Sequence, residues 1–126
     1  MKVSVFRVEK PNGAGPYGDM VHPVLAHMNA AHGDADHPDP TDDAVLEGIY
    51  PDEHCGFATV CDLDSWFEGY EDALAECGYS IAVYTVPIHA VRYGTKQCVF
   101  LRGDAVPKRT FPIADAATEA AMPCRL

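Results

Sequence analysis

Five carboxylates with a regular spacing are the first candidates for function in this sequence. They are Asp64, Glu68, Glu71, Asp72 and Glu76. On a helix, side chains four positions apart stand about 6 Å from one another, close to the distance between neighbouring phosphates along a nucleic-acid strand. Like charges at this spacing destabilise a helix, and no lysine within the segment relieves them. The pattern therefore favours a surface that occupies a basic groove built for nucleic acid.

A second group of carboxylates lies in a Pro-containing stretch upstream, which we expect to be a long acidic loop. Its members are Asp34, Asp36, Asp39, Asp42 and Asp43. We expect these side chains to form a second, more mobile part of the same partner-binding surface. Association driven by such charges is fast and sensitive to salt.

The charge balance of the whole chain supports a basic partner. The 126 residues carry a net charge of −10, and the segment from residue 11 to residue 91 contains 15 of the 19 acidic residues and no Lys or Arg. Proteins that bind nucleic acid or anionic membranes directly need clustered Lys and Arg, so both classes are disfavoured. The sequence instead predicts a negative lobe that steers a cationic protein.

Three histidines at five-residue intervals, His27, His32 and His37, raise the possibility of a metal site. Zinc sites usually show tight pairs such as HxxxH or CxxC, and neither occurs here, so we expect no metal and a solvated loop. The five cysteines form an odd set without a CxxC pair, which predicts reduced, mostly buried thiols. His54 beside Cys55 does not suggest a thiol nucleophile, because adjacent strand residues point to opposite faces.

No cofactor-binding or targeting motif is present. Neither GxxxxGK[ST] nor GxGxxG occurs, and no run of eighteen apolar residues could span a membrane. The first residues have no signal-peptide pattern. We therefore expect a cytoplasmic protein without a bound cofactor.

The predicted elements must position these carboxylates. Apolar and polar residues alternate over residues 2–9, which predicts a strand. A short helix is predicted over residues 20–31 and a loop over residues 32–44. The main helix is predicted over 62–77, with Asp62 as its cap and Gly78 after its end. Two or three antiparallel strands are expected between residues 79 and 101.

These elements predict an α+β domain over residues 1–111. A small, mostly antiparallel sheet built from both ends of the chain would pack on the helix 62–77, with the acidic loop between. Residues 112–126 are small, Ala-rich and flanked by Pro, and we expect them to form a loosely ordered tail.

Several short motifs resemble those of a small phage and prophage family of largely uncharacterised proteins. They are Phe6-Arg7-Val8-Glu9, Gly15-Pro16-Tyr17, Cys55-Gly56-Phe57, Asp62-Leu63-x-x-Trp66-Phe67 and Gln97-Cys98-Val99-Phe100. The resemblance covers residues 5–101. It implies a protein that acts inside a bacterial host.

The same order of motifs weakly resembles the ADP-ribosyltransferase fold. That resemblance implies that Arg7 holds the phosphates of NAD and that Tyr17 or Phe57 stacks on nicotinamide. The position of the catalytic glutamate falls on Gln97, a neutral amide that stabilises an oxocarbenium-like state much less well.

Two functional hypotheses follow. The first is a phage-encoded inhibitor of the anti-CRISPR or anti-restriction type, which binds a basic host protein or nucleoprotein complex by nucleic-acid mimicry and contacts neither nucleic acid nor membrane. The second is an NAD-dependent enzyme that modifies a host protein through Arg7, Tyr17 and Gln97. An accessory phage protein without a target in host defence is a third possibility.

Overall fold

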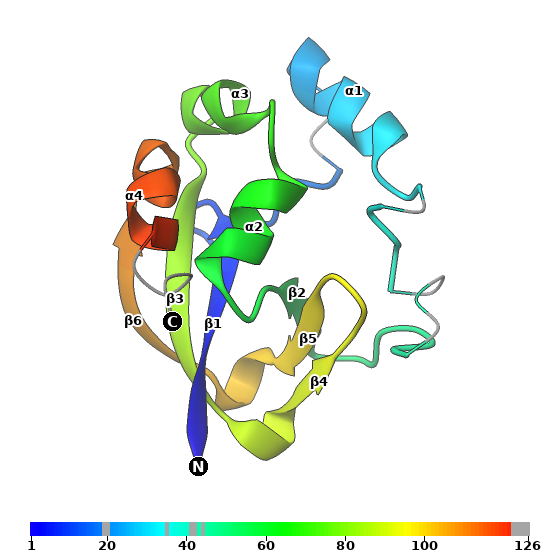
Figure 1. The fold of residues 1–126 in the computed structure, drawn as a ribbon, viewed down its shortest axis with the longest axis vertical. Coiled ribbons are helices and arrows are strands. Elements are labelled where there is room, and N and C mark those ends of the chain that lie inside the picture. The colour runs from blue at the N-terminus through cyan, green and yellow to red at the C-terminus, as the bar shows by residue number, and fades with distance from the viewer. Residues whose placement is uncertain (19–20, 35, 41–42, 44, 122–126) are drawn as a thin grey trace.

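The computed structural model describes residues 1–18, 21–34, 36–40, 43 and 45–121. Within these residues, two three-stranded antiparallel sheets, ordered β1-β3-β6 and β2-β5-β4, combine with four short α-helices (Figure 1). The elements are β1 (Lys2–Glu9), α1 (Pro23–Ala31), β2 (Glu53–Gly56), α2 (Val60–Trp66), α3 (Glu71–Glu76), β3 (Ser80–Pro87), β4 (Val91–Tyr93), β5 (Cys98–Leu101), β6 (Val106–Phe111) and α4 (Ala116–Ala121). The predicted α+β class is confirmed.

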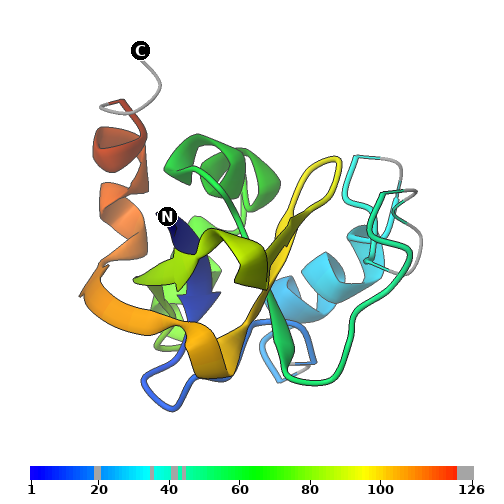
Figure 2. The same ribbon diagram turned by 90° about the horizontal axis from the view of Figure 1, so that it is seen from below.

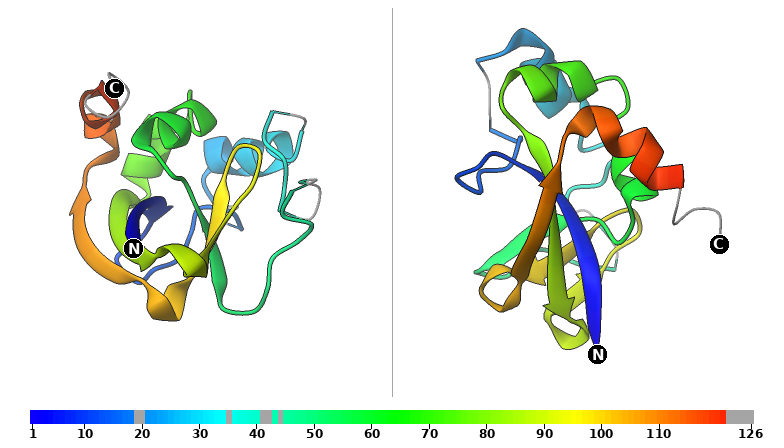
Figure 3. Two further views of the ribbon diagram at one scale, coloured as in Figure 1. Left: turned by 60° about the horizontal axis from the view of Figure 1, so that its bottom comes forward. Right: turned by 90° about the vertical axis from the view of Figure 1, so that its left-hand side faces the viewer.

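The first sheet joins the two ends of the chain. β1 pairs with β3 over its whole length, from Lys2 opposite Pro87 to Glu9 opposite Ser80. Helices α2 and α4 lie on one side of this sheet (Figure 3). The core on that side includes Leu63, Leu74 and Ile81, each at most 1 % exposed. Burial of these apolar side chains therefore holds the helices on the sheet.

The single helix predicted over 62–77 is wrong, because the segment forms two helices. Gly69 lies between α2 and α3 with φ +91°, a conformation that glycine adopts at low cost. The N-terminal cap is also different from the predicted Asp62. Thr59 caps the helix, because its hydroxyl oxygen accepts a hydrogen bond of 3.1 Å from the backbone N–H of Asp62. Gly78, with φ +88°, follows α3 as the sequence predicts.

The two sheets meet at Gly56 and Phe57. Phe6 and Phe57 exchange two backbone hydrogen bonds of 2.9 and 2.8 Å, which join β1 to the end of β2. A Cβ atom at position 56 would lie 2.6 Å from Cγ1 of Val5. Glycine at this position therefore lets the two sheets approach closely.

The connection between α1 and β2 runs along the outside of the molecule beside the β4–β5 turn (Figure 2). Its described residues form turns and loop, as predicted for 32–44. Arg92 on β4 donates hydrogen bonds to the carbonyl oxygens of Leu46 and Gly48 at 2.9 and 3.1 Å. This long connection is thus fastened to the second sheet.

After β5 the chain forms a strand and a short helix, and the expected loose tail begins only at residue 112. Residues 106–111 form β6, an edge strand whose first five residues are exposed. Ile113 and Ala116 then enter the core at 4 % and 2 % exposure, so the chain is packed up to α4. Residues 122–126 lie outside the described part. No helix in the described part is long and apolar enough to cross a bilayer.

The cysteines only partly follow the prediction of reduced thiols. Cys55, Cys77 and Cys98 are free. Cys61 is disulfide-bonded, so the prediction is wrong for that residue. Cys124 lies outside the described residues. Burial raises the pKa of the Cys98 thiol to about 12, which makes this side chain an inert core residue.

Candidate functional site

Helices α2 and α3 and the turn between them, which contains Glu68, carry the first group of predicted carboxylates. We call Asp64, Glu68, Glu71, Asp72 and Glu76 the acidic surface. Burial together with the charges of Glu71 and Glu68 raises the pKa of the Asp64 carboxyl. In the described part of the chain, the ion pairs formed by Lys or Arg involve Glu9, Glu53 and Glu119 and none of these five residues. Glu71 and Glu68 therefore repel Asp64 without compensation from a described Lys or Arg.

The helix break changes the shape of this surface. Gly69 donates its backbone N–H to Glu71 Oε1 at 2.9 Å, so Glu71 also stabilises the turn between the helices. Glu76 pairs with His22 Nε2 at 3.0 Å, which links α3 to the start of α1. A straight row of carboxylates on one helix, as the spacing predicts, is therefore not formed.

The second predicted group divides into exposed and buried members. Asp34, Asp36 and Asp39 are exposed. Asp42 lies outside the described residues. Asp43 is only 2 % exposed and is not available to a partner, which corrects the prediction for this residue. Burial opposes its charge, but hydrogen bonds from Thr95, Val45 and Leu46 outweigh this effect and lower its pKa.

A cleft of about 540 Å³ opens between the acidic loop, α2 and the β4–β5 turn. Side chains from distant parts of the sequence line it. They include Tyr17, His32, His37, Asp39, Cys55, Trp66 and Gln97. A volume of this size is typical of a small-molecule or side-chain binding site.

A chain of hydrogen bonds crosses this cleft. The Trp66 indole N–H donates to the Tyr17 hydroxyl at 2.6 Å. The hydroxyl in turn lies 2.5 Å from His32 Nδ1. Because the indole can only donate, the Tyr17 oxygen accepts from Trp66, and its own proton remains available to a neutral His32 whose Nδ1 is unprotonated. Burial, aided by His37, lowers the pKa of His32 to about 4, so this imidazole is neutral at pH 7.

The rings of His32 and His37 are stacked, with centroids 4.0 Å apart. His37 Nδ1 lies 2.9 Å from Asp34 Oδ1, and this contact is the main cause of the lowered pKa of Asp34. His27 is elsewhere, beside the Tyr70 hydroxyl at 3.1 Å. Across the part of the chain that the structure describes, no group of three His, Cys, Asp or Glu side chains could hold a metal ion.

The three residues of the enzyme hypothesis are not brought to one open site. Tyr17 and Gln97 line the cleft. Arg7 instead donates to the carbonyl oxygens of Cys55 and Gly13 at 2.8 and 3.4 Å, and its side chain is 12 % exposed. Its guanidinium therefore joins β1 to β2 and the 13–15 loop. Phe57, the other candidate for stacking, is a core residue at 4 % exposure.

Sequence reasoning did not assign Trp66, His32 and His37 to a common site. Trp66 is the only tryptophan of the chain, and the histidines appeared only as a disfavoured metal motif. Their five-residue spacing corresponds to no single helix face. A turn after α1 brings the two imidazole rings together; in it Gly33 has φ +115° and Asp34 Oδ1 accepts the backbone N–H groups of Asp36 and His37.

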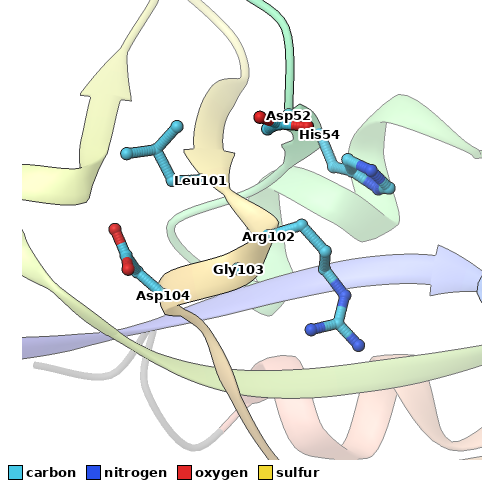
Figure 4. Close-up of a pocket in the computed structure, with 6 residues that line it drawn as sticks. All are labelled: Asp52, His54, Leu101, Arg102, Gly103 and Asp104. Carbon is cyan, nitrogen blue, oxygen red and sulfur yellow. The ribbon is translucent and has the colours of Figure 1, made fainter.

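Several basic side chains share a groove on the first sheet. Lys10, Arg102, Lys108 and Arg109 line a groove of about 510 Å³ beside β3 and β6. A smaller pocket nearby is lined by Asp52, His54 and Asp104 among others, and there the Asp104 carboxylate and the Arg102 guanidinium point away from each other (Figure 4). Both pockets therefore combine acidic and basic side chains.

The comparisons with known proteins give one match. A family model described as Bacteriophage T4 Y00F protein matches residues 1–114. Neither a curated protein nor a solved structure matches the chain. The match supports the resemblance to a phage protein family, whereas the resemblance to ADP-ribosyltransferases is not shown.

Proposed function

Because the chain belongs to the Bacteriophage T4 Y00F family, we propose that it is a phage protein whose acidic surface binds a basic, nucleic-acid-contacting surface of a host defence complex. Binding there excludes the nucleic acid and inhibits the complex. The protein acts in the cytoplasm of the bacterial host and needs neither a metal nor a cofactor.

The observation that carries this proposal is the repulsion that Glu71 and Glu68 exert on Asp64 within the acidic surface. Asp64 has a raised pKa partly because Glu71 and Glu68 stand close to it, and no described Lys or Arg pairs with these three carboxylates. Such a cluster lowers the stability of the free protein. A basic partner would relieve the repulsion, which increases the free energy gained on binding.

Competition with nucleic acid tests the proposal directly. Purified CRISPR effector and restriction complexes of the host would be loaded with a labelled DNA duplex, and DNA release would be followed by fluorescence anisotropy as the protein is added. We expect release from at least one complex. We also expect the apparent affinity to fall steeply between 50 and 200 mM salt, roughly tenfold or more, because the contacts are ionic.

Two variants that each remove two negative charges distinguish an effect of the acidic surface from an effect of the protein's net charge. Asp64→Asn/Glu68→Gln should abolish DNA release. Asp52→Asn/Asp104→Asn changes two exposed carboxylates of the pocket in Figure 4 and should leave release intact. Failure to displace DNA from any complex, or equal loss in both variants, would contradict the proposal.

The enzyme hypothesis requires Arg7 to bind the phosphates of NAD. In the structure this guanidinium is bonded to backbone carbonyl oxygens and lies beside Glu9, 3.3 Å from its carboxylate. These contacts of Arg7 disfavour the enzyme hypothesis. A melting curve with and without NAD provides the check, since a rise in Tm with NAD would favour the enzyme.

A further inference from the structure

The cleft between the acidic loop and α2 has the electrostatics of a cation site. Among the described residues that line it, Asp39 supplies a carboxylate and none is Lys or Arg. A second carboxylate, Asp34, lies directly behind His37 through the 2.9 Å contact to its Nδ1. His32 carries no charge at pH 7, because its pKa is about 4, so it does not repel a cation.

Aromatic rings make up much of the cleft wall. Tyr17 is stacked on Phe67, yet 45 % of its surface remains exposed. His37 is stacked on His32 and meets the Trp66 ring edge to face at 4.9 Å. Aromatic walls attract a cation through the ring quadrupole, and a planar cation can also stack on them.

The polar groups that remain in the cleft are mainly hydrogen-bond acceptors. Gln97 uses its amide nitrogen to donate to the Pro38 carbonyl at 2.7 Å, which leaves its amide oxygen as an acceptor. His37 donates through Nδ1 to Asp34, so its Nε2 is an acceptor when the ring is neutral. A ligand with several N–H groups matches this set.

We propose that the cleft binds the guanidinium group of an arginine side chain presented by the basic partner, stacked against Tyr17 and His37 and facing Asp39 and Gln97. This inference rests on the proposed function and names the side chain that anchors the partner. Arginine suits the cleft better than lysine because its cation is planar and carries five N–H donors.

Trp66 allows a direct test on the intact protein. As the only tryptophan, with its indole N–H bonded to Tyr17, it reports on the cleft through its fluorescence. The protein would be titrated at constant ionic strength with a blocked tripeptide that has a central arginine. A second titration would use the same tripeptide with citrulline, which keeps the planar shape and lacks the charge.

We expect a saturable change with the arginine tripeptide and about tenfold weaker binding of the citrulline tripeptide. Asp39→Asn should weaken arginine binding several-fold. Asp104→Asn, which changes another exposed aspartate outside the cleft, should not alter arginine binding. Tyr17→Leu should abolish binding, provided that the melting curve shows a folded protein.

Other results would overturn the inference. Equal binding of both tripeptides would show that charge is not recognised. Uridine and adenosine would be titrated in the same way. If they change the Trp66 fluorescence and the arginine tripeptide does not, the cleft binds a neutral heterocycle. If DNA release still depends on Asp64 and Glu68 while the arginine tripeptide does not bind, this inference fails and the proposed function stands. If the tripeptide binds and no complex releases DNA, the proposed function fails.

Discussion

The carboxylate of Asp43 accepts two hydrogen bonds from Thr95, one from the backbone N–H and one from the hydroxyl, each 2.9 Å long, although 52 residues separate the two. The same carboxylate accepts the N–H groups of Val45 and Leu46 at 2.8 and 3.1 Å. Asp43 therefore fixes the acidic loop to the β4–β5 turn, and with it one wall of the cleft.

Removing this carboxylate should destabilise the protein. Asp43→Ala leaves four hydrogen-bond donors without an acceptor, which should reduce the free energy of unfolding by about 2–4 kcal/mol in urea denaturation. Asp36→Ala, an exposed aspartate of the same loop, should change it by less than about 0.5 kcal/mol. Equal stability of the two variants would show that Asp43 does not fasten the loop.

The ion pair between Arg92 and Glu53 should contribute far more to the free energy of unfolding than an exposed pair does. Arg92 donates to both Glu53 oxygens at 2.9 and 2.6 Å, and the Glu53 side chain is 3 % exposed. Arg92→Met should reduce the free energy of unfolding by about 3–5 kcal/mol, because it leaves a buried carboxylate without its counter-ion.

The exposed pair of Arg109 and Glu119 provides the comparison for Arg92. Its side chains are 51 % and 34 % exposed. Arg109→Met should therefore cost at most about 1 kcal/mol in the same denaturation assay. A loss for Arg92→Met that is no larger than this would refute the structural role of the buried pair.

Gly56→Ala tests the close approach of the two sheets. The added methyl would lie 2.6 Å from Val5 Cγ1 and 3.1 Å from the Phe6 carbonyl oxygen. We expect a loss of about 1–3 kcal/mol from overpacking, measured by thermal unfolding. At Gly103 a methyl meets nothing within 4 Å, so Gly103→Ala should be nearly neutral. A neutral Gly56→Ala variant would mean that the sheets can separate there without cost.

His32 should make stability depend on pH. Its pKa is about 4 in the folded protein and 6.5 without perturbation, so the unfolded chain binds the proton more readily. The stability that His32 contributes is therefore fully present above pH 6.5 and is lost as the pH falls towards 4.

The variant His32→Asn isolates this effect. Asparagine can still accept the Tyr17 hydroxyl and does not titrate, so the difference in Tm between wild type and variant should shrink as the pH is lowered from 7 to 4.5. NMR titration of the His32 ring provides a direct check. A ring pKa near 6.5 would contradict the burial of this imidazole against His37.

Local patterns predict much of the fold but little of the site. Alternation correctly predicts the strand at residues 2–9, and Gly78 correctly marks the end of a helix. The break at Gly69 was missed because the apolar spacing of Leu63, Phe67, Tyr70 and Leu74 continues across it. β6 was missed because its first five residues are exposed, which removes the apolar alternation of a strand.

The site depends on contacts between distant segments. The position of Asp43 in a Pro-containing loop does not predict that its carboxylate is buried and bonded to Thr95. The spacing of His32 and His37 likewise does not predict that their rings stack. The acidic surface could be proposed from the sequence, because the number of carboxylates and the lack of Lys and Arg between them can be counted directly along the chain.

The pairing of β1 with β3 bears on how the chain folds during synthesis. Residues 2–9 find their sheet neighbour only at residues 80–87, and ribosomes add about 5–20 residues per second. The first strand therefore leaves the ribosome about 4–16 s before its partner. During that interval its apolar edge is open to aggregation, and the charged residues Lys2, Arg7 and Glu9 within it oppose such pairing with other chains.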